Sequence, residues 1–483
     1  MLFNSIDFVL FLPLVFIIYW CISSDRPKEQ NLFLLLASYF FYGCWNWKFL
    51  GLIAFSTLID YLIGLALGKE IKQVRRTWLL MTSIFVNIGL LGFFKYYNFF
   101  LESFVDSFSM LGIEFSPNRL NILLPVGISF YTFQTLSYTI DVYRGKLAPT
   151  KDFIAFAAFV SYFPQLVAGP IERATHLLPQ FFKRRAFSYE KAVNGMQQVL
   201  WGLVKKVIVA DNCARIVDHI YANSDTLTAS TLVLGILLFS FQVYGDFSGY
   251  SDIAIGLARL FGFNLKQNFN YPYFSRDYGE FWRRWHISIS TWFRDYVYIP
   301  LGGNRGSKLI NARNILIVFA ISGLWHGANW TFILFGLFNG LFVLPSMLRG
   351  THKKHTGTVA ENRRLPTFRE FFGMLSTFLT ISFLLILFRA NNLAHALDYF
   401  IGLFSFSIFS GLGLPNINGV YTTILIVIIF ILIEWNGRTR LFAIENLGYG
   451  WKKSYRWAVY ICITFAIIYL GAFDEGRFIY FQF

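Results

Sequence analysis

Two histidines stand where the surrounding sequence makes an imidazole costly to solvate. His326 lies within the apolar run ILIVFAISGLWHGANWTFILFGLFNG, and His286 lies within the aromatic and basic segment EFWRRWHISISTWFRD. Because a bilayer core solvates polar groups poorly, ionisable side chains in such runs usually face a cavity or a proton path. A buried imidazole with no anion beside it stays neutral, which suits a general base toward a hydroxyl. His326 is therefore a candidate catalytic base, and the alternative is a histidine that bonds a backbone carbonyl at a helix break.

The residues around His326 could orient its ring. On a helix, Ser322 and Asn329 fall on the face of His326, because side chains three or four positions apart are neighbours. Gly323 and Gly327 form a small-xxx-small pair, which lets a second helix approach closely. We therefore expect Ser322 or Asn329 to hold the imidazole, and another helix to pack tightly beside it.

The segment 280–296 is predicted to be one amphipathic helix. One face carries an apolar stripe at helical spacing, formed by Trp282, Trp285, Ile289 and Trp292. The other face is cationic and holds Arg283, His286, Ser290 and Arg294. Clustered arginines either anchor to anionic lipid head groups or bind the phosphate oxygens of an anionic donor. The pattern alone leaves both roles open.

Two carboxylates lie near apolar sequence in YGDFSGYSDIAIG, at Asp246 and Asp252. A spacing of six places them about 240° apart on a helix, at roughly 100° per residue. They share no face unless Gly249 breaks the helix, so we expect each to bond a helix end or a neighbouring arginine. The four cysteines lack metal-ligand spacing and no HExxH or CxxC motif occurs, so no metal site is expected.

The composition predicts an all-α polytopic membrane protein. Of the 483 residues, 55% are hydrophobic, 20% are aromatic and only 14% are charged. Apolar runs of about 15 to 20 residues recur, long enough to cross or enter a bilayer core of roughly 30 Å. We expect one integral membrane domain over 1–483, with about 10–12 transmembrane helices plus re-entrant and interfacial helices. Lys and Arg gather in loops, so the net charge of +15 indicates a cytoplasmic membrane face and not nucleic acid binding.

Two segments break the alternation of basic and non-basic loops. Residues 153–169 and 315–347 each have basic residues at both ends. The first is short enough to enter and leave on one side, and the second either crosses once or turns back near His326, which the loop charges favour. Non-spanning backbone at membrane depth must be shielded by protein or line a wet cavity. We place the basic, amphipathic region 263–313 on the cytoplasmic side and both termini outside.

Six stretches carry a resemblance to a known family. They are PVGISFYTFQTLSYTIDVYRG (125–145), SYFPQLVAGPIER (161–173), QVYGDFSGYSDIAIG (242–256), NFNYPYFSRDYGEFWRRWHISISTWFRDYVYIPLGGNRGS (268–307), GLWHGANWTFILFGLFNG (323–340) and the terminal FIYFQF. In these stretches the chain resembles the membrane-bound O-acyltransferases, in particular their bacterial alginate O-acetylation branch. The stretches run over almost the whole chain, and the two that bear histidine are specific.

The resemblance implies an enzyme that moves an acyl group, expected to be acetyl, from a cytoplasmic donor toward an acceptor outside a bacterial inner membrane. It places the catalytic histidine at His326 and a second one at His286, at a tunnel through the protein centre, within a core over about 122–345. Residues expected to bind donor or substrate are Arg283, Arg284, Trp285, Ser290, Arg294, Trp325 and Asn329. Structural roles are expected for Asp246, Asp252 and Ser322.

The resemblance also implies the partners. The donor is acetyl-CoA or an acyl carrier protein thioester, no cofactor stays bound, and an extracytoplasmic protein of the SGNH-hydrolase type completes transfer to a polysaccharide such as alginate. Two alternatives keep the same chemistry, namely O-acetylation of peptidoglycan and D-alanylation of teichoic acid. An alternative of another class is a transporter for a polysaccharide or an acyl carrier, in which the histidine serves a proton path. Inverted repeats with paired broken helices would favour transport, and the sequence shows none.

Overall fold

The computed structural model describes residues 1–113, 119–351, 354–413 and 419–473, and the terminal FIYFQF motif lies outside these ranges. All regular secondary structure within them is helical, which confirms the all-α class. The chain folds into two compact units. The first comprises residues 1–192 and 257–266, and the second comprises 193–256 and 267–483.

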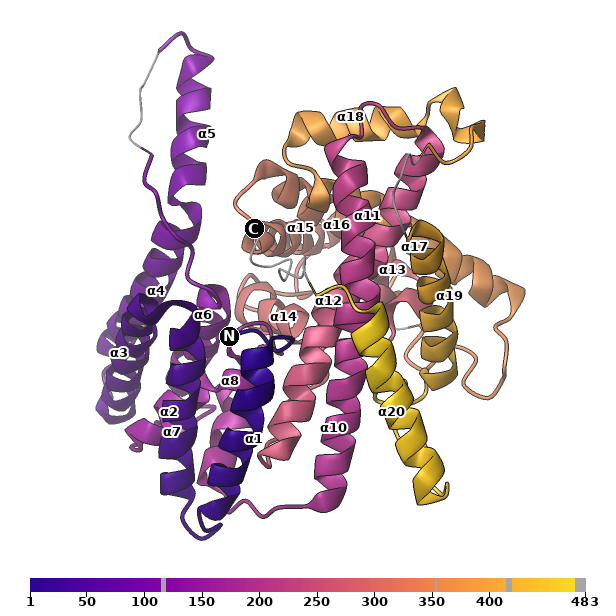
Figure 1. Cartoon of the computed structure of the whole chain (residues 1–483). Helices are drawn as coiled ribbons and strands as arrows, with labels where there is room; N and C mark the ends of the chain where they lie inside the picture. The colour runs from indigo at the N-terminus through magenta and orange to yellow at the C-terminus, as the bar shows by residue number, and fades with distance from the viewer. Residues whose placement is uncertain (114–118, 352–353, 414–418, 474–483) are drawn as a thin grey trace. The chain divides into compact units, whose positions relative to one another are not determined.

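The first unit is built from long helices followed by short ones (Figure 1). In chain order they are α1 (Ile6–Cys21), α2 (Pro27–Asn46), η1 (Trp47–Phe49), α3 (Leu50–Lys69), α4 (Gln73–Leu91), η2 (Gly92–Tyr96), α5 (Tyr97–Ser109), α6 (Ile128–Tyr143), α7 (Phe153–Ser161), α8 (Phe163–Leu166), α9 (Ala174–Leu177) and η3 (Leu178–Phe182). The π-helical turn η2 joins α4 to α5, so this helix continues past residue 97.

Helix α6 is the buried centre of the first unit and packs against α3 and α4. A polar network joins these three helices. Asp60 accepts hydrogen bonds from Ser83 at 2.6 Å and from Asn87 at 2.8 Å, and Thr135 of α6 donates to Asn87 at 3.1 Å. Because each of these buried groups finds a partner, the network specifies how the three helices pack.

The segment 153–169 is too short to span a bilayer, as its flanking charges indicate. Helix α7 has nine residues, which is about 14 Å of helix. The chain then bends at Tyr162 into the single turn of α8. Nearly every side chain from Ala155 to Ala168 is buried within the first unit, so this non-spanning backbone is shielded by protein.

The second unit contains the longest helix of the described chain, α12 (Ala229–Leu260), whose last turn belongs to the first unit. The other elements are α10 (Tyr189–Leu203), η4 (Val204–Ala210), α11 (Asp211–Ala222), η5 (Pro272–Phe274), α13 (Tyr278–Arg284), α14 (Ile287–Phe293), η6 (Arg294–Tyr298), α15 (Lys308–His326), α16 (Trp330–Leu348), α17 (Phe368–Arg389), α18 (Leu393–Leu403), η8 (Phe406–Phe409), α19 (Val420–Gly437) and α20 (Lys453–Leu470).

Glycines bring α12 against the continuous helix formed by α10 and η4. A Cβ added at Gly249 would lie 2.8 Å from the carbonyl oxygen of Gly202, and one added at Gly245 would lie 2.7 Å from that of Lys205. Only glycine permits so close an approach of two backbones. Gly249 does not break α12, so the helix continues past both Asp246 and Asp252.

Helices α15 and α16 form an antiparallel hairpin. The chain turns at Gly327, directly after His326, which confirms the bend favoured by the loop charges. A Cβ added at Gly323 would lie 2.1 Å from the carbonyl oxygen of Phe332, and one added at Gly336 would lie 2.1 Å from that of Phe319. The tight packing expected beside Gly323 is therefore present, and the second helix is α16.

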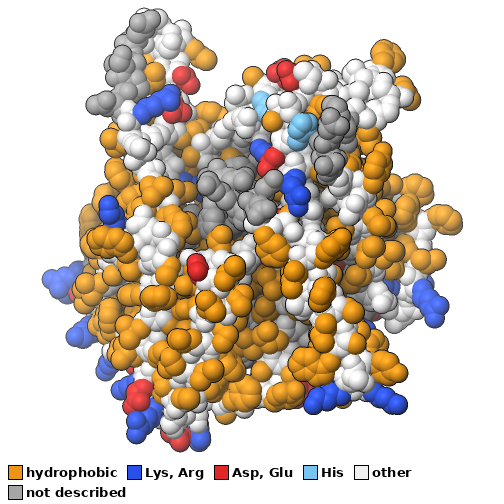
Figure 2. All heavy atoms as spheres, viewed as in Figure 1, with side chains coloured by type: hydrophobic (Ala, Val, Ile, Leu, Met, Phe, Trp, Pro, Cys, Tyr) orange, Lys and Arg blue, Asp and Glu red, His pale blue; other side chains and the backbone are white. Residues whose placement is uncertain are grey.

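Seven helices of the described chain are long and apolar enough to cross a membrane, which confirms a multi-pass membrane protein. The estimate of 10–12 spans was larger because several apolar runs fold into shorter helices, such as the 16-residue α1 and α6. Figure 2 shows hydrophobic side chains over most of the visible face, with Lys and Arg gathered toward its lower edge. Apolar surface of this extent suits contact with lipid.

Candidate active site

The expected single helix over 280–296 is broken at His286, so this prediction was wrong. Helix α13 ends at Arg284, Trp285 is extended, and His286 has a left-handed backbone with φ +44°. Asn268 fixes the break, since its carbonyl oxygen accepts from Ile287 N at 2.8 Å and its side chain accepts from Ser288 N at 3.1 Å. A non-glycine residue in this conformation costs free energy, and such residues cluster at functional sites.

The His286 side chain is buried among aromatic rings. The ring centroids of Phe269, Trp325 and Phe247 lie 5.6, 5.8 and 6.3 Å from that of its imidazole. Among the described residues its Nδ1 atom has no hydrogen-bond partner. Burial lowers the pKa of the His286 imidazole to about 3. The side chain is therefore neutral at physiological pH, with a polar atom available inside a closed aromatic environment.

His326 lies beside the same tryptophan. It is the last residue of α15 and is buried, with its ring centroid 4.9 Å from that of Trp325 and 5.2 Å from that of Phe388 in α17. The Trp325 ring thus contacts both imidazoles. The helix break at His286 and the hairpin turn at His326 meet here, although 40 positions separate the two histidines in the chain.

Of the two polar neighbours expected to orient His326, Asn329 makes contacts that hold the hairpin turn. Asn329 caps α16 by accepting from Thr331 N at 3.1 Å, and its amide donates to the carbonyl oxygen of Asn391 at 2.9 Å. It therefore anchors the hairpin turn to the segment that follows α17. Ser322 is half-buried in the last turn of α15.

The arginines expected to bind a donor form no common cationic face. Arg284 is buried and pairs with Glu280 at 2.9 Å, while Arg283 donates to the carbonyl oxygen of His355 at 2.7 Å. Arg294 lies in η6, half-exposed, and pairs with its neighbour Asp295 at 2.7 Å. Ser290 donates to the carbonyl oxygen of Trp285 at 3.4 Å. Breaking the helix at His286 turns these side chains toward local partners.

Asp246 and Asp252 each pair with a buried lysine, whereas the sequence predicted a helix end or a neighbouring arginine as the partner. Lys206 lies 2.6 Å from Asp246 and 2.8 Å from Asp211, and Lys205 lies 3.0 Å from Asp252. Both aspartates of α12 therefore reach the same neighbouring segment, η4. Lys205 and Lys206, which are consecutive in η4, reach these aspartates because the contacts of Gly245 and Gly249 align α12 with the helix formed by α10 and η4.

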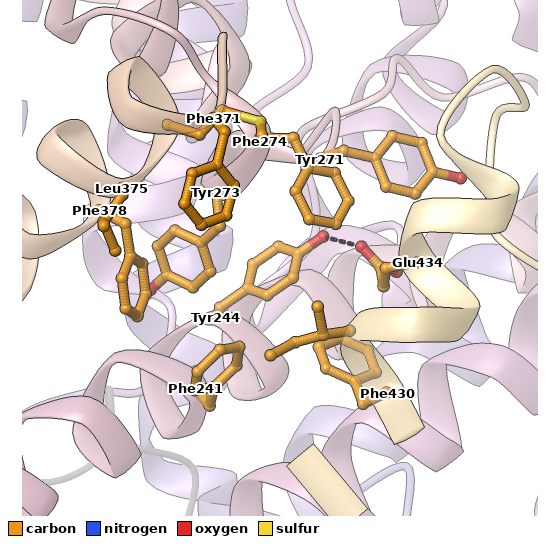
Figure 3. A pocket seen from close by; sticks show the side chains of 12 residues that line it. Phe241, Tyr244, Tyr271, Tyr273, Phe274, Phe371, Leu375, Phe378, Phe430 and Glu434 are labelled. Carbon is orange, nitrogen blue, oxygen red and sulfur yellow. Dashed lines mark hydrogen bonds between the residues drawn. The ribbon is translucent and has the colours of Figure 1, made fainter. Parts of the chain in front are cut away.

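An apolar pocket of about 280 Å³ lies in the second unit between α12, η5, α17 and α19 (Figure 3). Its wall is largely aromatic and contains one carboxylate, Glu434, which accepts from the Tyr244 hydroxyl at 2.6 Å and lies 3.4 Å from Lys205. The rings of Tyr244 and Tyr273 also pack on Trp285, at 6.2 and 6.0 Å between centroids. Two residues of the pocket wall therefore contact Trp285, the residue that precedes His286.

Sequence reasoning missed the residues that complete this environment. Phe388 and Glu434 belong to segments far from both histidine motifs, and nothing in their local sequence marks them. Phe269 lies in the same stretch as His286, but its contact with the imidazole could not be read from spacing. Among the described residues no group of three or more His, Cys, Asp or Glu side chains could hold a metal ion.

Comparison with known proteins places this site in a family. The model of the membrane-bound O-acyltransferase family matches residues 32–388, which include both histidines. A probable alginate O-acetylase of Azotobacter vinelandii is 43% identical over 84% of this chain and 78% of its own length. A protein of the same name from Pseudomonas putida is 38% identical over the full length of both chains. A peptidoglycan O-acetyltransferase of Helicobacter pylori is 37% identical over 83% of this chain and 80% of its own length.

The matched region thus holds the two imidazoles, the tryptophan between them, and the apolar helices of a membrane enzyme. The chain belongs to the membrane-bound O-acyltransferase family and is an O-acyltransferase.

Proposed function

We propose that this enzyme transfers an acetyl group from a cytoplasmic thioester donor to hydroxyl groups of a polysaccharide outside the inner membrane, with His326 as general base. The observation that carries the proposal is the placement of two buried imidazoles on one tryptophan ring, His286 at 5.8 Å and His326 at 4.9 Å. Burying a histidine in an apolar protein costs solvation free energy, so ionisable residues in such surroundings usually serve the function of the protein.

The reaction needs a proton acceptor for the attacking hydroxyl and a hydrogen-bond donor to the thioester carbonyl oxygen. His326 takes the proton from the attacking hydroxyl, whose oxygen forms a bond to the thioester carbonyl carbon. The carbon–sulfur bond then breaks, the acyl ester is released, and the proton passes from the imidazolium to the leaving thiolate. A neutral His286 fits the role of a hydrogen-bond partner to the substrate, because its Nδ1 is buried and without a partner among the described residues.

The donor in this proposal is acetyl-CoA or an acyl carrier protein thioester. Trp285 and the aromatic pocket beside it form an apolar surface next to His286, which suits the hydrocarbon part of a thioester arm. Trp325 separates the two histidines and would contact the acyl group. Arg283, Arg284, Ser290 and Arg294 reach protein partners, so their contribution is to position the donor site around the break at His286.

The names of the similar proteins suggest which glycan accepts the acetyl group. Proteins named as alginate O-acetylases match this chain over most of its length, which supports an alginate-like exopolysaccharide. The Helicobacter pylori relative supports peptidoglycan as a second candidate acceptor. In either case an extracytoplasmic partner of the SGNH-hydrolase type would complete transfer, with both termini of this chain on the partner's side of a bacterial inner membrane.

The test measures ester-linked acetate on purified extracellular polysaccharide and on purified peptidoglycan. Cells would carry wild type, His326→Ala, or the control His219→Ala, an exposed histidine of α11, with equal membrane abundance verified. We expect His326→Ala to abolish acetate on one glycan while His219→Ala preserves it. The glycan that loses acetate identifies the acceptor. Unchanged acetate in His326→Ala cells would refute the role of His326 and favour the transporter alternative.

A further inference from the structure

A basic pocket of about 370 Å³ lies in the first unit, apart in sequence from both histidine motifs. It is enclosed by the end of α1, the loop after η3, the start of α10 and the end of α12. Five cationic side chains line it, namely Lys183, Arg184, Arg185, Lys191 and Arg259. No carboxylate is among the described residues that line it, so the pocket attracts anions.

The buried Arg185 gives the pocket a fixed positive charge. Its guanidinium donates to Gln30 at 3.1 Å, to Asn31 at 2.8 Å and to the carbonyl oxygen of Pro27 at 3.1 Å, which are all neutral groups. These bonds hold the side chain in place but leave its charge without a carboxylate within salt-bridge distance among the described residues. A buried charge of this kind is stabilised when an anion binds beside it.

Two lysines with flexible side chains add positive charge at the rim of this pocket. Lys183 and Lys191 are exposed, and neither ammonium pairs with a carboxylate in the described part of the chain. Arg184 pairs with Asp25 at 3.1 Å, but both side chains are two-thirds exposed, so that pair contributes little. Lysine ammonium groups bind phosphate as point charges, and two of them can close over a phosphate without a fixed geometry.

One wall of the pocket is aromatic and rigid. Trp20 donates to the carbonyl oxygen of Leu260 at 3.0 Å, and its ring packs on Phe187 at 5.5 Å between centroids. The apolar helices α1 and α12 end at this wall, after Cys21 and Leu260. Charged side chains where apolar helices end lie at the level of lipid head groups. In Figure 2, Lys and Arg atoms gather at the lower ends of the first unit's helices.

We propose that this pocket binds a phosphate group, either that of an anionic phospholipid or that of a soluble phosphate compound. The inference is independent of the acyl transfer proposed above, because it rests on residues of the first unit only. It assigns a ligand class to the segment KRRAFSYEK, whose basic residues otherwise have no role beyond membrane topology.

The experiment uses the purified full chain with two probes. Native mass spectrometry would measure binding of phosphatidylglycerol against phosphatidylcholine, and calorimetry would measure binding of inorganic pyrophosphate. The pocket variant is Lys183→Gln with Lys191→Gln, which removes two exposed charges and leaves Arg185 intact. The control variant is Lys69→Gln with Lys72→Gln, which removes the same charge from exposed positions elsewhere in the first unit.

We expect the pocket variant to bind its probe about 30-fold more weakly than wild type, at roughly fivefold per lysine, and the control to bind as wild type does. A loss confined to phosphatidylglycerol identifies a lipid head group as the ligand, and a loss confined to pyrophosphate identifies a soluble phosphate. The proposal is overturned if wild type binds neither probe, or if the pocket and control variants bind both probes equally.

Discussion

A methyl group added at Gly336 should move the hairpin that carries His326. The Cβ of a Gly336→Ala variant would lie 2.1 Å from the backbone carbonyl oxygen of Phe319, whereas ordinary contact begins at 3.4 Å. The helices α15 and α16 must therefore separate by more than 1 Å at this level, since a backbone carbonyl cannot rotate away. Overpacking of this kind costs about 1–3 kcal/mol, and the helix propensity of alanine returns about 1 kcal/mol.

The same helix offers a matched control. A Cβ at Gly340 would lie 3.2 Å from side-chain atoms of Leu316 and Phe319, which can shift slightly. We therefore expect Gly340→Ala to keep wild-type stability or exceed it, and Gly336→Ala to lose up to about 2 kcal/mol. Because a misplacement of about 1 Å at a reacting group can cost 100-fold in rate, Gly336→Ala should reduce acyl transfer 10- to 100-fold.

The assay compares acetyl transfer per mole of folded protein in membranes, together with thermal unfolding in detergent. Normalising to folded protein separates a displaced His326 from a simple loss of protein. Equal turnover by the Gly336→Ala and Gly340→Ala proteins would refute the argument, because it would mean that the hairpin tolerates separation without moving the imidazole.

Three further outcomes follow from the site. His286→Gln keeps a neutral hydrogen-bonding side chain and should retain at least tenfold more acetyl transfer than His286→Leu; equal activities would show that the imidazole serves packing alone. Because burial lowers the pKa of His286 to about 3, the unfolded state binds more protons than the folded state below its ordinary value of 6.5. Stability should therefore fall by about 2 kcal/mol from pH 7.5 to pH 5 in wild type relative to His286→Gln, as measured by chemical unfolding. Asp246→Ala removes one of the two carboxylates on buried Lys206 and should destabilise by about 3 kcal/mol in the same unfolding assay, whereas Asp106→Ala, at an exposed position of α5, should not.

Much of the fold could be predicted, because the length of the apolar runs and the charge of the loops indicate which segments of a membrane protein form helices. The recurring apolar runs predicted an all-helical chain, and the basic flanks of 315–347 indicated the turn that lies beside His326. The basic flanks of 153–169 likewise indicated a segment that does not cross. The helical character of 97–109 and 211–222 was missed, because those stretches mix charged and apolar residues and their helices continue neighbouring ones through π-helical turns.

The candidate site could be predicted only in part, since its residue types are visible in the sequence and its contacts are not. His286 and His326 were identifiable as polar groups in apolar surroundings. The break at His286 was not, because WRRWHISIS has helical spacing on both sides and the left-handed residue is held by Asn268, at a distance in the chain. Once the helix breaks, the predicted cationic face no longer exists, because Arg283 lies in α13 whereas Ser290 and Arg294 lie beyond the break.

Aromatic rings pack on both histidines. The rings of Phe269 and Trp325 contact the His286 imidazole, and those of Trp325 and Phe388 contact the His326 imidazole. An aspartate beside His286 would hold a proton on it and raise its pKa, whereas aromatic walls keep it neutral. The carboxylates of the second unit instead meet Lys205 and Lys206, whose bonds hold α12 in register. Under the proposed mechanism, the neutral His286 imidazole would serve as a hydrogen-bonding group on the same Trp325 ring that His326, the candidate base, contacts.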